Sequence, residues 1–275
     1  GDFCQAGRHD LLLSDGDGLA AETWEGQELW RSPEVPVFLI TISAEPLGGA
    51  RRIYAFIGER KVEEQQNVRG HVGQRCVADE LIALDGLSGR VEARLKLPEE
   101  DDMDLMRNWD VSNETGRLVS DAKVDICVRQ WRKDCGGGGR DVWAYDADLN
   151  ELWHACVDPP YGHHNAVHML DLNGDGRDEV LAGGTLLSAD GETIAVHDMA
   201  GELEQIRGAG HYDAVVAGRF GEDEESAPVA FLMAGSAGVY VIDPLTGRTR
   251  AVHRIGHAQW GLPCKVRDDM AGQQV

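Results

Sequence analysis

The sequence predicts an all-β protein, a β-propeller of about five four-stranded blades. Three observations predict it: one hairpin pattern occurs five times, a short apolar run precedes each hairpin, and helical periodicity is nearly absent. The 275 residues are enough to bury a large core. We therefore expect a single propeller domain, or a portion of one.

Each predicted hairpin has an alternating strand, a short turn that contains Gly or Asn, and a second strand. Period-two alternation indicates strands with one buried face, and the turn residues supply the positive φ that β-branched residues avoid. The five hairpins span residues 18–30, 81–93, 142–153, 186–196 and 239–252. The apolar runs before them, at 10–13, 37–40, 124–128, 179–181 and 229–232, bring each unit to about four strands.

The hairpin spacing divides the chain into blade units. We expect them at 1–32, 36–98, 105–155, 161–207 and 208–254, with the start of a further blade at 256–275. Residues 270–275 align with residues 5–10, so that the chain starts and stops at one point of a blade. We expect an excerpt from a larger ring of seven or eight blades rather than a complete five-bladed ring.

A nine-residue acidic run at 171–179 predicts a calcium site. Ca²⁺ requires six to eight oxygen ligands, and a short loop supplies them from alternate side chains around a sharp glycine turn. The expected ligands are the side chains of Asp171, Asn173, Asp175 and Glu179 and the carbonyl of Arg177. Strand-like runs flank the loop, which separates it from a helical EF-hand. The alternative is an acidic β-turn that simply favours solvent.

A Gly-His series occurs where one hairpin ends and the next blade begins. Its copies are 162–165, 210–213 and 256–259, and in a propeller they would line one mouth of the central channel. Imidazole and phenol groups there can transfer a proton, and a cation must neutralise a uronate carboxylate during β-elimination. The candidate catalytic residues are His163, His164, His211 and Tyr212, and the candidate substrate-binding residues are His257, Gln259 and Arg219.

A structural role for the same histidines stays open, because a packing device is needed in every blade whereas a catalytic group is needed once. We expect His168 and His197 to be structural. Trp30, Trp143 and Trp153 lie in hairpin strands and predict packing between blades, whereas Trp260 is better placed as a platform for a sugar ring.

Composition excludes some classes of partner. The formal net charge of -22 argues against nucleic acid, and no apolar run is long enough to span a membrane. The start of the chain has no signal segment. Among the six cysteines, Cys127 and Cys135 could form a disulfide across a hairpin or remain buried thiols.

The calcium run resembles the FG-GAP/VCBS repeat of calcium-binding propellers. Residues 149–184, 235–240 and 256–259 resemble propellers of the rhamnogalacturonan-lyase-like class. The resemblance implies an extracellular or periplasmic protein that binds calcium and cleaves acidic polysaccharides by β-elimination. Ulvan-type propeller lyases use His and Tyr, which matches the candidate residues in kind. Residues 1–10 look like a degenerate calcium loop, with Cys4 and Ala6 where oxygen ligands would be.

The leading expectation is a polysaccharide lyase-like propeller that acts on a uronate-containing glycan, with structural Ca²⁺. The runner-up is a non-catalytic FG-GAP/VCBS propeller that binds glycan or protein at the same mouth. A quinone-dependent dehydrogenase, suggested by the 81–89 hairpin, ranks lowest because no cofactor set accompanies it.

Overall fold

The computed structural model describes most of the chain. The described residues are 10–66, 72–97, 112–131, 140–157, 167–198, 212–221, 226–264 and 269. Nineteen strands and no helix occur among them, which confirms the predicted all-β class. Within this described part, no helix is long and apolar enough to cross a membrane.

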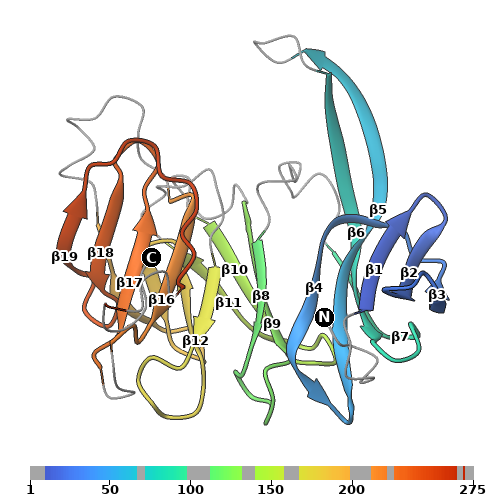
Figure 1. Ribbon diagram of the computed structural model, residues 1–275, viewed down its shortest axis with the longest axis horizontal. Helices are drawn as coiled ribbons and strands as arrows, with labels where there is room; N and C mark the ends of the chain where they lie inside the picture. The colour runs from blue at the N-terminus through green and yellow to red at the C-terminus, as the bar shows by residue number, and fades with distance from the viewer. Residues whose placement is uncertain are drawn as a thin grey trace. The chain divides into compact units, whose positions relative to one another are not determined.

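The strands form five antiparallel sheets, as expected for a propeller-like fold (Figure 1). The first sheet has the order β1-β2-β3, with strands Asp10–Asp15, Gly18–Thr23 and Glu28–Ser32. The second has the order β4-β5-β6-β7, with strands Pro36–Leu47, Ala50–Gln66, Val72–Asp85 and Val91–Lys96. The third has the order β11-β10-β9-β8, with β8 Ser112–Gly116, β9 Asp125–Trp131, β10 Arg140–Tyr145 and β11 Glu151–Val157.

The last two sheets repeat the same up-and-down order. The fourth, β12-β13-β14-β15, has strands Val167–Leu170, Glu179–Ala182, Thr185–Leu187 and Thr193–Val196. The fifth, β16-β17-β18-β19, has strands Ala214–Gly218, Val229–Met233, Val239–Asp243 and Arg248–His253. Four sheets lie inside the units expected from hairpin spacing, whereas β11 of the third ends at Val157, two residues past the expected boundary at 155. Among the described residues the first sheet has three strands where four were expected.

Tertiary contacts divide the chain into two compact units, whereas the sequence suggests one domain. The first contains residues 1–108, 115–126 and 145–152, and the second contains 109–114, 127–144 and 153–275. A cluster in the first unit centres on buried Leu19, Ile53 and Ile82. A cluster in the second unit centres on buried Leu181, Leu232 and Tyr240. The buried residues of each cluster recur at every second position of a strand, because successive side chains of a strand point to opposite faces of the sheet.

All five predicted hairpins are present, and a shared turn chemistry closes them. The carboxylate of Asp85 accepts the backbone N–H groups of Leu87 and Ser88, and that of Asp146 accepts those of Asp148 and Asn150. A residue with positive φ follows in each turn: Gly26, Gly89, Leu149, Gly191 and Gly247. Leu149 is the one described residue other than glycine with positive φ, at 62°.

Two tryptophans pack against hairpin turns in the same way. The indole N–H of Trp30 donates to the carbonyl of Gly86, and that of Trp153 donates to Ala189, each at 2.8 Å. A Cβ added to Gly89 would lie 2.3 Å from the Trp30 ring, and one added to Gly191 would lie 2.7 Å from the Trp153 ring. Glycine therefore lets each indole lie flat on the turn of the next sheet, which confirms the predicted packing of Trp30 and Trp153.

The sequence analysis did not predict the length of one hairpin. Strands β5 and β6 have 17 and 14 residues, and they pair from Arg52 with Asp85 outward to Gln66 with Val72. Figure 1 shows this hairpin extending far past the other strands of its sheet. Its outer part has no apolar run, so hydrophobic patterning does not signal it.

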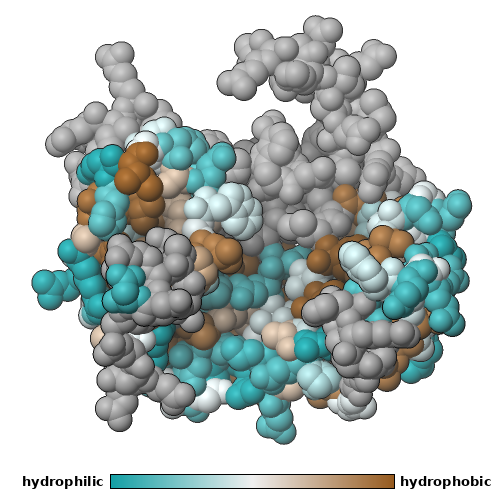
Figure 2. All heavy atoms as spheres, in the orientation of Figure 1, coloured by the Kyte–Doolittle hydropathy of each residue, from teal (hydrophilic) through white to brown (hydrophobic). Residues whose placement is uncertain are grey.

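The surface of the described part is hydrophilic over much of one face. On the face drawn in Figure 2, hydrophilic residues cover much of the described surface and hydrophobic residues gather in separate patches. The most exposed large apolar side chains described are Trp260 at 87%, Leu262 at 75%, Trp24 at 73% and Ile255 at 71%. Three of these four lie within eight residues of one another near the C-terminus, beyond β19.

Candidate functional site

The predicted calcium loop connects β12 to β13, whose last and first residues, Leu170 and Glu179, pair across the strands. The chain reverses sharply at Gly174 and Gly176, which have φ of 85° and 90°. A residue with a Cβ adopts such angles at a cost, so both turns favour glycine. The loop thus carries its oxygen-bearing residues on a tight turn between two strands, as the sequence predicts.

The side chains of the loop fold inward onto its own backbone. Asp171 accepts the N–H groups of Gly174 and Gly176 at 2.6 and 2.9 Å. The amide nitrogen of Asn173 donates to Asp175 Oδ2 at 3.0 Å and to Glu179 Oε1 at 2.6 Å. One neutral donor is therefore shared by two carboxylates, one from the middle of the loop and one from its end.

Glu179 is the most constrained of these acids. The residue is 2% exposed, and its Oε2 accepts the N–H groups of Leu172 and Asn173 at 2.8 and 3.2 Å. Burial raises the pKa of its carboxyl, and the nearby charges of Asp175 and Asp171 raise it further. A hard divalent cation would neutralise the buried carboxylate of Glu179 together with the half-buried carboxylate of Asp171 and the exposed one of Asp175. The residues present therefore fit Ca²⁺.

A second loop, between β8 and β9, has the same form without the same ligands. Asp125 is fully buried, and its Oδ2 accepts the N–H groups of Leu118, Val119 and Ser120 at 2.8, 2.8 and 2.9 Å. Leu118 precedes Asp125 by seven residues, just as Leu172 precedes Glu179.

The first ligand position separates the two loops. Arg117 stands where the calcium loop has Asp171, and its guanidinium pairs with Glu45 at 3.2 Å. The loop between β8 and β9 is thus a structural copy of the 171–179 loop, in which the guanidinium of Arg117 supplies a positive charge. Sequence reasoning missed this copy, because Arg117 and Val119 replace the first and third oxygen ligands and only Asp121 and Asp125 keep acidic positions.

Arg219 directly follows β16, as Asp171 directly follows β12, and it also makes structural hydrogen bonds. Its guanidinium donates to the carbonyls of Ser226 and Leu172 at 2.7 and 2.8 Å. Because Leu172 belongs to the calcium loop, Arg219 links two neighbouring loops. These bonds give Arg219 a structural role, and its substrate-binding role stays a prediction.

Of the four predicted catalytic residues, the structure describes Tyr212. His163, His164 and His211 lie outside the described residues. Tyr212 is 2% exposed within the core of the second unit. Its hydroxyl lies 2.8 Å from His197 Nδ1 and donates to the His197 carbonyl at 3.2 Å. A phenol so enclosed cannot meet a polysaccharide, so Tyr212 acts as a packing residue in this structure.

The two histidines expected to be structural have structural contacts. His197 is 2% exposed, and its Nε2 lies 3.0 Å from Thr249 Oγ1. His168 lies 3.1 Å from Glu114 through Nδ1 and 3.1 Å from the carbonyl of Ala217 through Nε2. Both rings thus join neighbouring strands by hydrogen bonds on their two nitrogens.

His257 is the described member of the Gly-His series that reaches the surface with polar partners. Its Nε2 lies 3.2 Å from Oδ2 of Asp213, and the two side chains are 45% and 4% exposed. Its Nδ1 lies 3.3 Å from the hydroxyl of Ser236, on the turn between β17 and β18. An accessible imidazole held by a buried carboxylate is suited to take or give a proton. We call Asp213, Ser236 and His257 the His257 cluster.

Three further side chains, those of Arg254, Gln259 and Trp260, lie within three residues of His257 along the chain. Arg254 binds the Ser236 turn, donating to the Ala237 carbonyl at 2.9 Å, and lies 5.7 Å from the centre of the Tyr240 ring. Gln259 and Trp260 follow on the exposed segment, the indole being 87% exposed. A flat apolar ring beside charged and amide groups is the usual equipment for stacking on a pyranose and bonding its hydroxyls.

Sequence reasoning missed Asp213 and Ser236. Asp213 closes the Gly-His-Tyr-Asp copy, in the place that Gln259 takes in the next copy, so the repeat itself carried a signal for it. No sequence pattern marks Ser236, because its approach to His257 depends on how the turn before β18 folds back. The bridge between Gly235 and Ala258 brings those two segments together.

Cysteines are found in both redox states. Cys127 is a buried thiol and Cys264 is a second thiol. Cys127 therefore does not pair with Cys135 in this structure, which leaves the predicted alternative of a buried thiol. Cys156 is disulfide-bonded to a cysteine outside the described side chains.

Comparison with solved structures finds the same fold in three rhamnogalacturonan lyases. The Bacillus licheniformis rhamnogalacturonan lyase PL11 aligns with a TM-score of 0.65 and 16% identity, over 99% of this chain and 53% of that chain. The lyase YesW aligns with a TM-score of 0.62 and 16% identity, over 98% and 50%. The exotype lyase YesX aligns with a TM-score of 0.62 and 17% identity, over 99% and 51%.

Neither a protein-family model nor a curated protein matches the sequence. The chain spans about half the length of the three solved lyases. At identities of 16 to 17% the likeness is one of fold, and it extends along nearly the whole chain. The chain thus has the propeller-like fold found in rhamnogalacturonan lyases.

Proposed function

We propose that this chain is part of a polysaccharide lyase-like propeller that acts on a uronate-containing glycan. The observation that carries the proposal is the fold shared with three rhamnogalacturonan lyases over 98 to 99% of the chain. Fold alone does not determine activity, so the chemistry is argued from the His257 cluster.

In this proposal His257 serves as the base. β-Elimination begins when a base removes the proton on the carbon beside the uronate carboxylate, and it ends with expulsion of the glycosidic oxygen. The Asp213 carboxylate stabilises the imidazolium that forms, and contact with Ser236 orients the ring. Gln259 and Trp260 supply hydrogen bonds and a stacking surface.

The carbanion intermediate requires a positive charge near the uronate carboxylate. Arg254 is the described candidate that best suits this role, since it binds the Ser236 turn. Arg219 is committed to the calcium loop, and Lys265 lies outside the described residues. In a chain with a net charge of -22, an anionic glycan needs such a local cationic group.

Calcium in this proposal is structural. Asp171, Asn173, Asp175, Glu179 and the carbonyl of Arg177 would hold it, and the ion would neutralise the acids of the loop. The loop would then hold β12 and β13 in register, and Arg219 would transmit that order to the next sheet. The disulfide of Cys156 supports an extracellular or periplasmic location, since such bonds persist in oxidising compartments.

The test is to incubate the chain with rhamnogalacturonan and with ulvan, and to follow the ultraviolet absorbance of the unsaturated uronate. We expect product from the unmodified protein and at least a tenfold lower rate from His257→Ala, typical of losing a general base. His253→Ala is the matched control, because His253 is exposed on β19 four residues earlier. Equal rates in the two variants would remove His257 from the mechanism.

A non-catalytic glycan-binding propeller is the second candidate. It is favoured by the structural commitment of Tyr212 and Arg219, which leaves the His257 cluster without a described phenolic acid. A binder would be retained on the immobilised glycan and release no unsaturated ends. Retention should fall in Trp260→Ala and persist in Trp24→Ala, which removes an indole of similar exposure elsewhere.

A further inference from the structure

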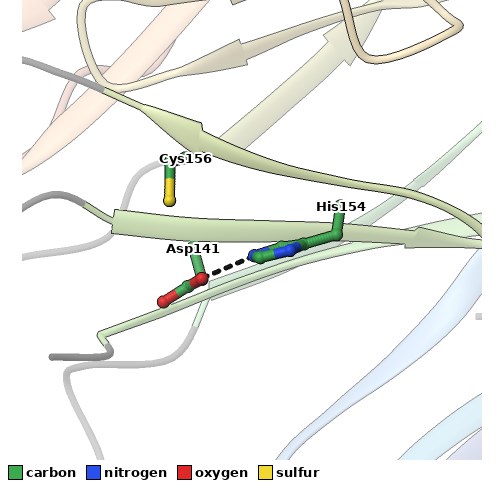
Figure 3. Close-up of side chains that lie close together, drawn as sticks. All are labelled: Asp141, His154 and Cys156. Atoms are coloured by element: carbon green, nitrogen blue, oxygen red, sulfur yellow. Dashed lines mark hydrogen bonds and ion pairs between the residues drawn. The ribbon is translucent and has the colours of Figure 1, made fainter. Parts of the chain in front are cut away.

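A second group of potential metal ligands lies on the hairpin β10–β11, apart from the calcium loop. Asp141 extends from β10, and His154 and Cys156 extend from β11 (Figure 3). One ligand atom from each residue lies within 4.8 Å of the others. His154 and Cys156 are two residues apart on one strand, so they share a face of the sheet, and Asp141 meets them from the adjoining strand.

The nitrogen ligand, His154, and the oxygen ligand, Asp141, are already held in place. His154 Nε2 lies 2.5 Å from Asp141 Oδ1, and the side chains are 37% and 1% exposed. The imidazole also stacks on the indole of Trp143, with ring centroids 4.6 Å apart and an interplanar angle of 12°. The carboxylate is thus fixed in the protein interior, whereas the imidazole is oriented but remains reachable from solvent.

The sulfur decides what this group can do. In a disulfide it has no thiolate electron pair to offer, and Cys156 is disulfide-bonded in this structure. Thiolate, imidazole and carboxylate are each ligands that Zn²⁺ takes in proteins, and three protein ligands leave a fourth position for water. Calcium and magnesium prefer oxygen alone, so this site and the 171–179 loop select different ions.

We propose that Asp141, His154 and Cys156 form a redox-gated site for Zn²⁺ or a similar borderline-soft cation. A thiol or phosphine reductant gives two electrons to the Cys156 disulfide and is itself oxidised, and two thiols result. Zn²⁺ then displaces the proton of the Cys156 thiol and bonds to sulfur, imidazole and carboxylate. A small disulfide oxidant then accepts the two electrons and becomes two thiols, taking protons from the partner thiol and from solvent, so that the Cys156 disulfide re-forms and the ion is released. Cys156 is exposed, so small reductants can reach it.

The site does not rest on the proposed function, because it lies on a different sheet from the His257 cluster and uses none of its residues. Metal binding and glycan cleavage can therefore fail separately. The inference concerns a switch in ion binding, with the disulfide and the metal competing for one sulfur atom.

The experiment measures binding of Zn²⁺ by calorimetry, and of Co²⁺ by its thiolate charge-transfer absorption, with and without a phosphine reductant. Excess Ca²⁺ occupies the 171–179 loop throughout. We expect the reduced protein to bind one additional ion and to show the thiolate band. The oxidised protein should lack both.

Variants identify the ligands. Cys156→Ser should abolish the thiolate band, and His154→Gln and Asp141→Asn should each weaken reduced-state binding by about tenfold or more, since even supporting residues of metal sites have effects of this size. Glu151→Gln, on the same strand, and Cys264→Ser, at another thiol, are the matched controls. Thermal unfolding of each reduced variant checks that it is folded.

Two results would overturn the proposal. The first is equal metal binding by folded protein in the oxidised and reduced states. The second is a thiolate band that persists in both His154→Gln and Asp141→Asn at full affinity, because the ion would then be bound to other thiols.

Discussion

The carboxylate of Glu179 accepts the backbone N–H of Leu172 at 2.8 Å, and the carboxylate of Asp125 accepts that of Leu118 at the same distance. In each case a buried acid at the start of a strand holds the preceding loop by binding the backbone of a leucine seven residues earlier. The loops differ in how the surrounding charge is balanced. The loop before Asp125 has Arg117, whose guanidinium pairs with Glu45, whereas the loop before Glu179 has Asp171 and Asp175 as further acids.

Calcium should stabilise the protein, and the effect should depend on pH. Burial raises the pKa of Glu179, so without a cation the folded state binds its proton more tightly than the unfolded chain does. The free energy of unfolding therefore falls as pH rises from the ordinary glutamate pKa toward the raised one, and the loss is complete above it. Ca²⁺ should cancel this loss.

The rise in Tm on adding CaCl2 after EGTA should be larger at neutral pH than at a pH below the ordinary glutamate pKa. Thermal unfolding monitored by circular dichroism measures it. Glu179→Gln should lose the response to Ca²⁺. At neutral pH this substitution should lower the Tm by less than EGTA lowers the Tm of the unmodified protein. Asp148→Asn, in an exposed turn, should keep the response. An identical response in both variants would disprove the site.

Removing Asp125 should destabilise the first unit regardless of calcium. Asp125→Ala leaves one buried and two half-buried backbone N–H groups and the Ser120 hydroxyl without their acceptor, and we expect a cost of about 3 kcal/mol. Urea unfolding with and without Ca²⁺ measures it. Asp121→Ala, which removes an exposed acid from the same loop, should cost less than about 0.5 kcal/mol.

Alanine should be poorly tolerated at the turns beneath the two tryptophans. Gly89 and Gly191 have φ of 68° and 81°, and a Cβ at either would press into an indole ring. We expect Gly89→Ala and Gly191→Ala each to cost about 2 kcal/mol or more, from backbone strain and overpacking together. Gly16→Ala is the control, since a Cβ there meets nothing within 4 Å. Comparable denaturation midpoints in all three would contradict this packing.

Loss of the Tyr212 hydroxyl should affect stability and leave activity alone. Tyr212→Phe removes the bond to His197 and should lower the free energy of unfolding by about 1 kcal/mol. The rate at which unsaturated uronate forms should stay within about twofold of the rate of the unmodified protein. A loss of rate approaching that of His257→Ala would instead return Tyr212 to the catalytic set.

Local patterns predicted the strands and turns well because their causes are local. The alternation of Val239–Asp243 and the Asp-to-Gly turn after it are properties of the backbone and of adjacent side chains. The oxygen spacing at 171–179 is local in the same sense, and the structure places those residues together. The long β5–β6 hairpin escaped prediction, because backbone pairing supports it where no hydrophobic pattern marks it.

The sequence by itself determined the all-β class, the hairpin rhythm and the residues of the acidic loop, since each depends on neighbours within about ten positions. Tertiary structure alone decided which histidines are buried and which are accessible. The sequence analysis already separated His197 from His257, but only the structure shows that the first lies between Tyr212 and Thr249 and that the second faces solvent beside Asp213. That difference arises from strands distant along the chain, whose packing no local pattern encodes.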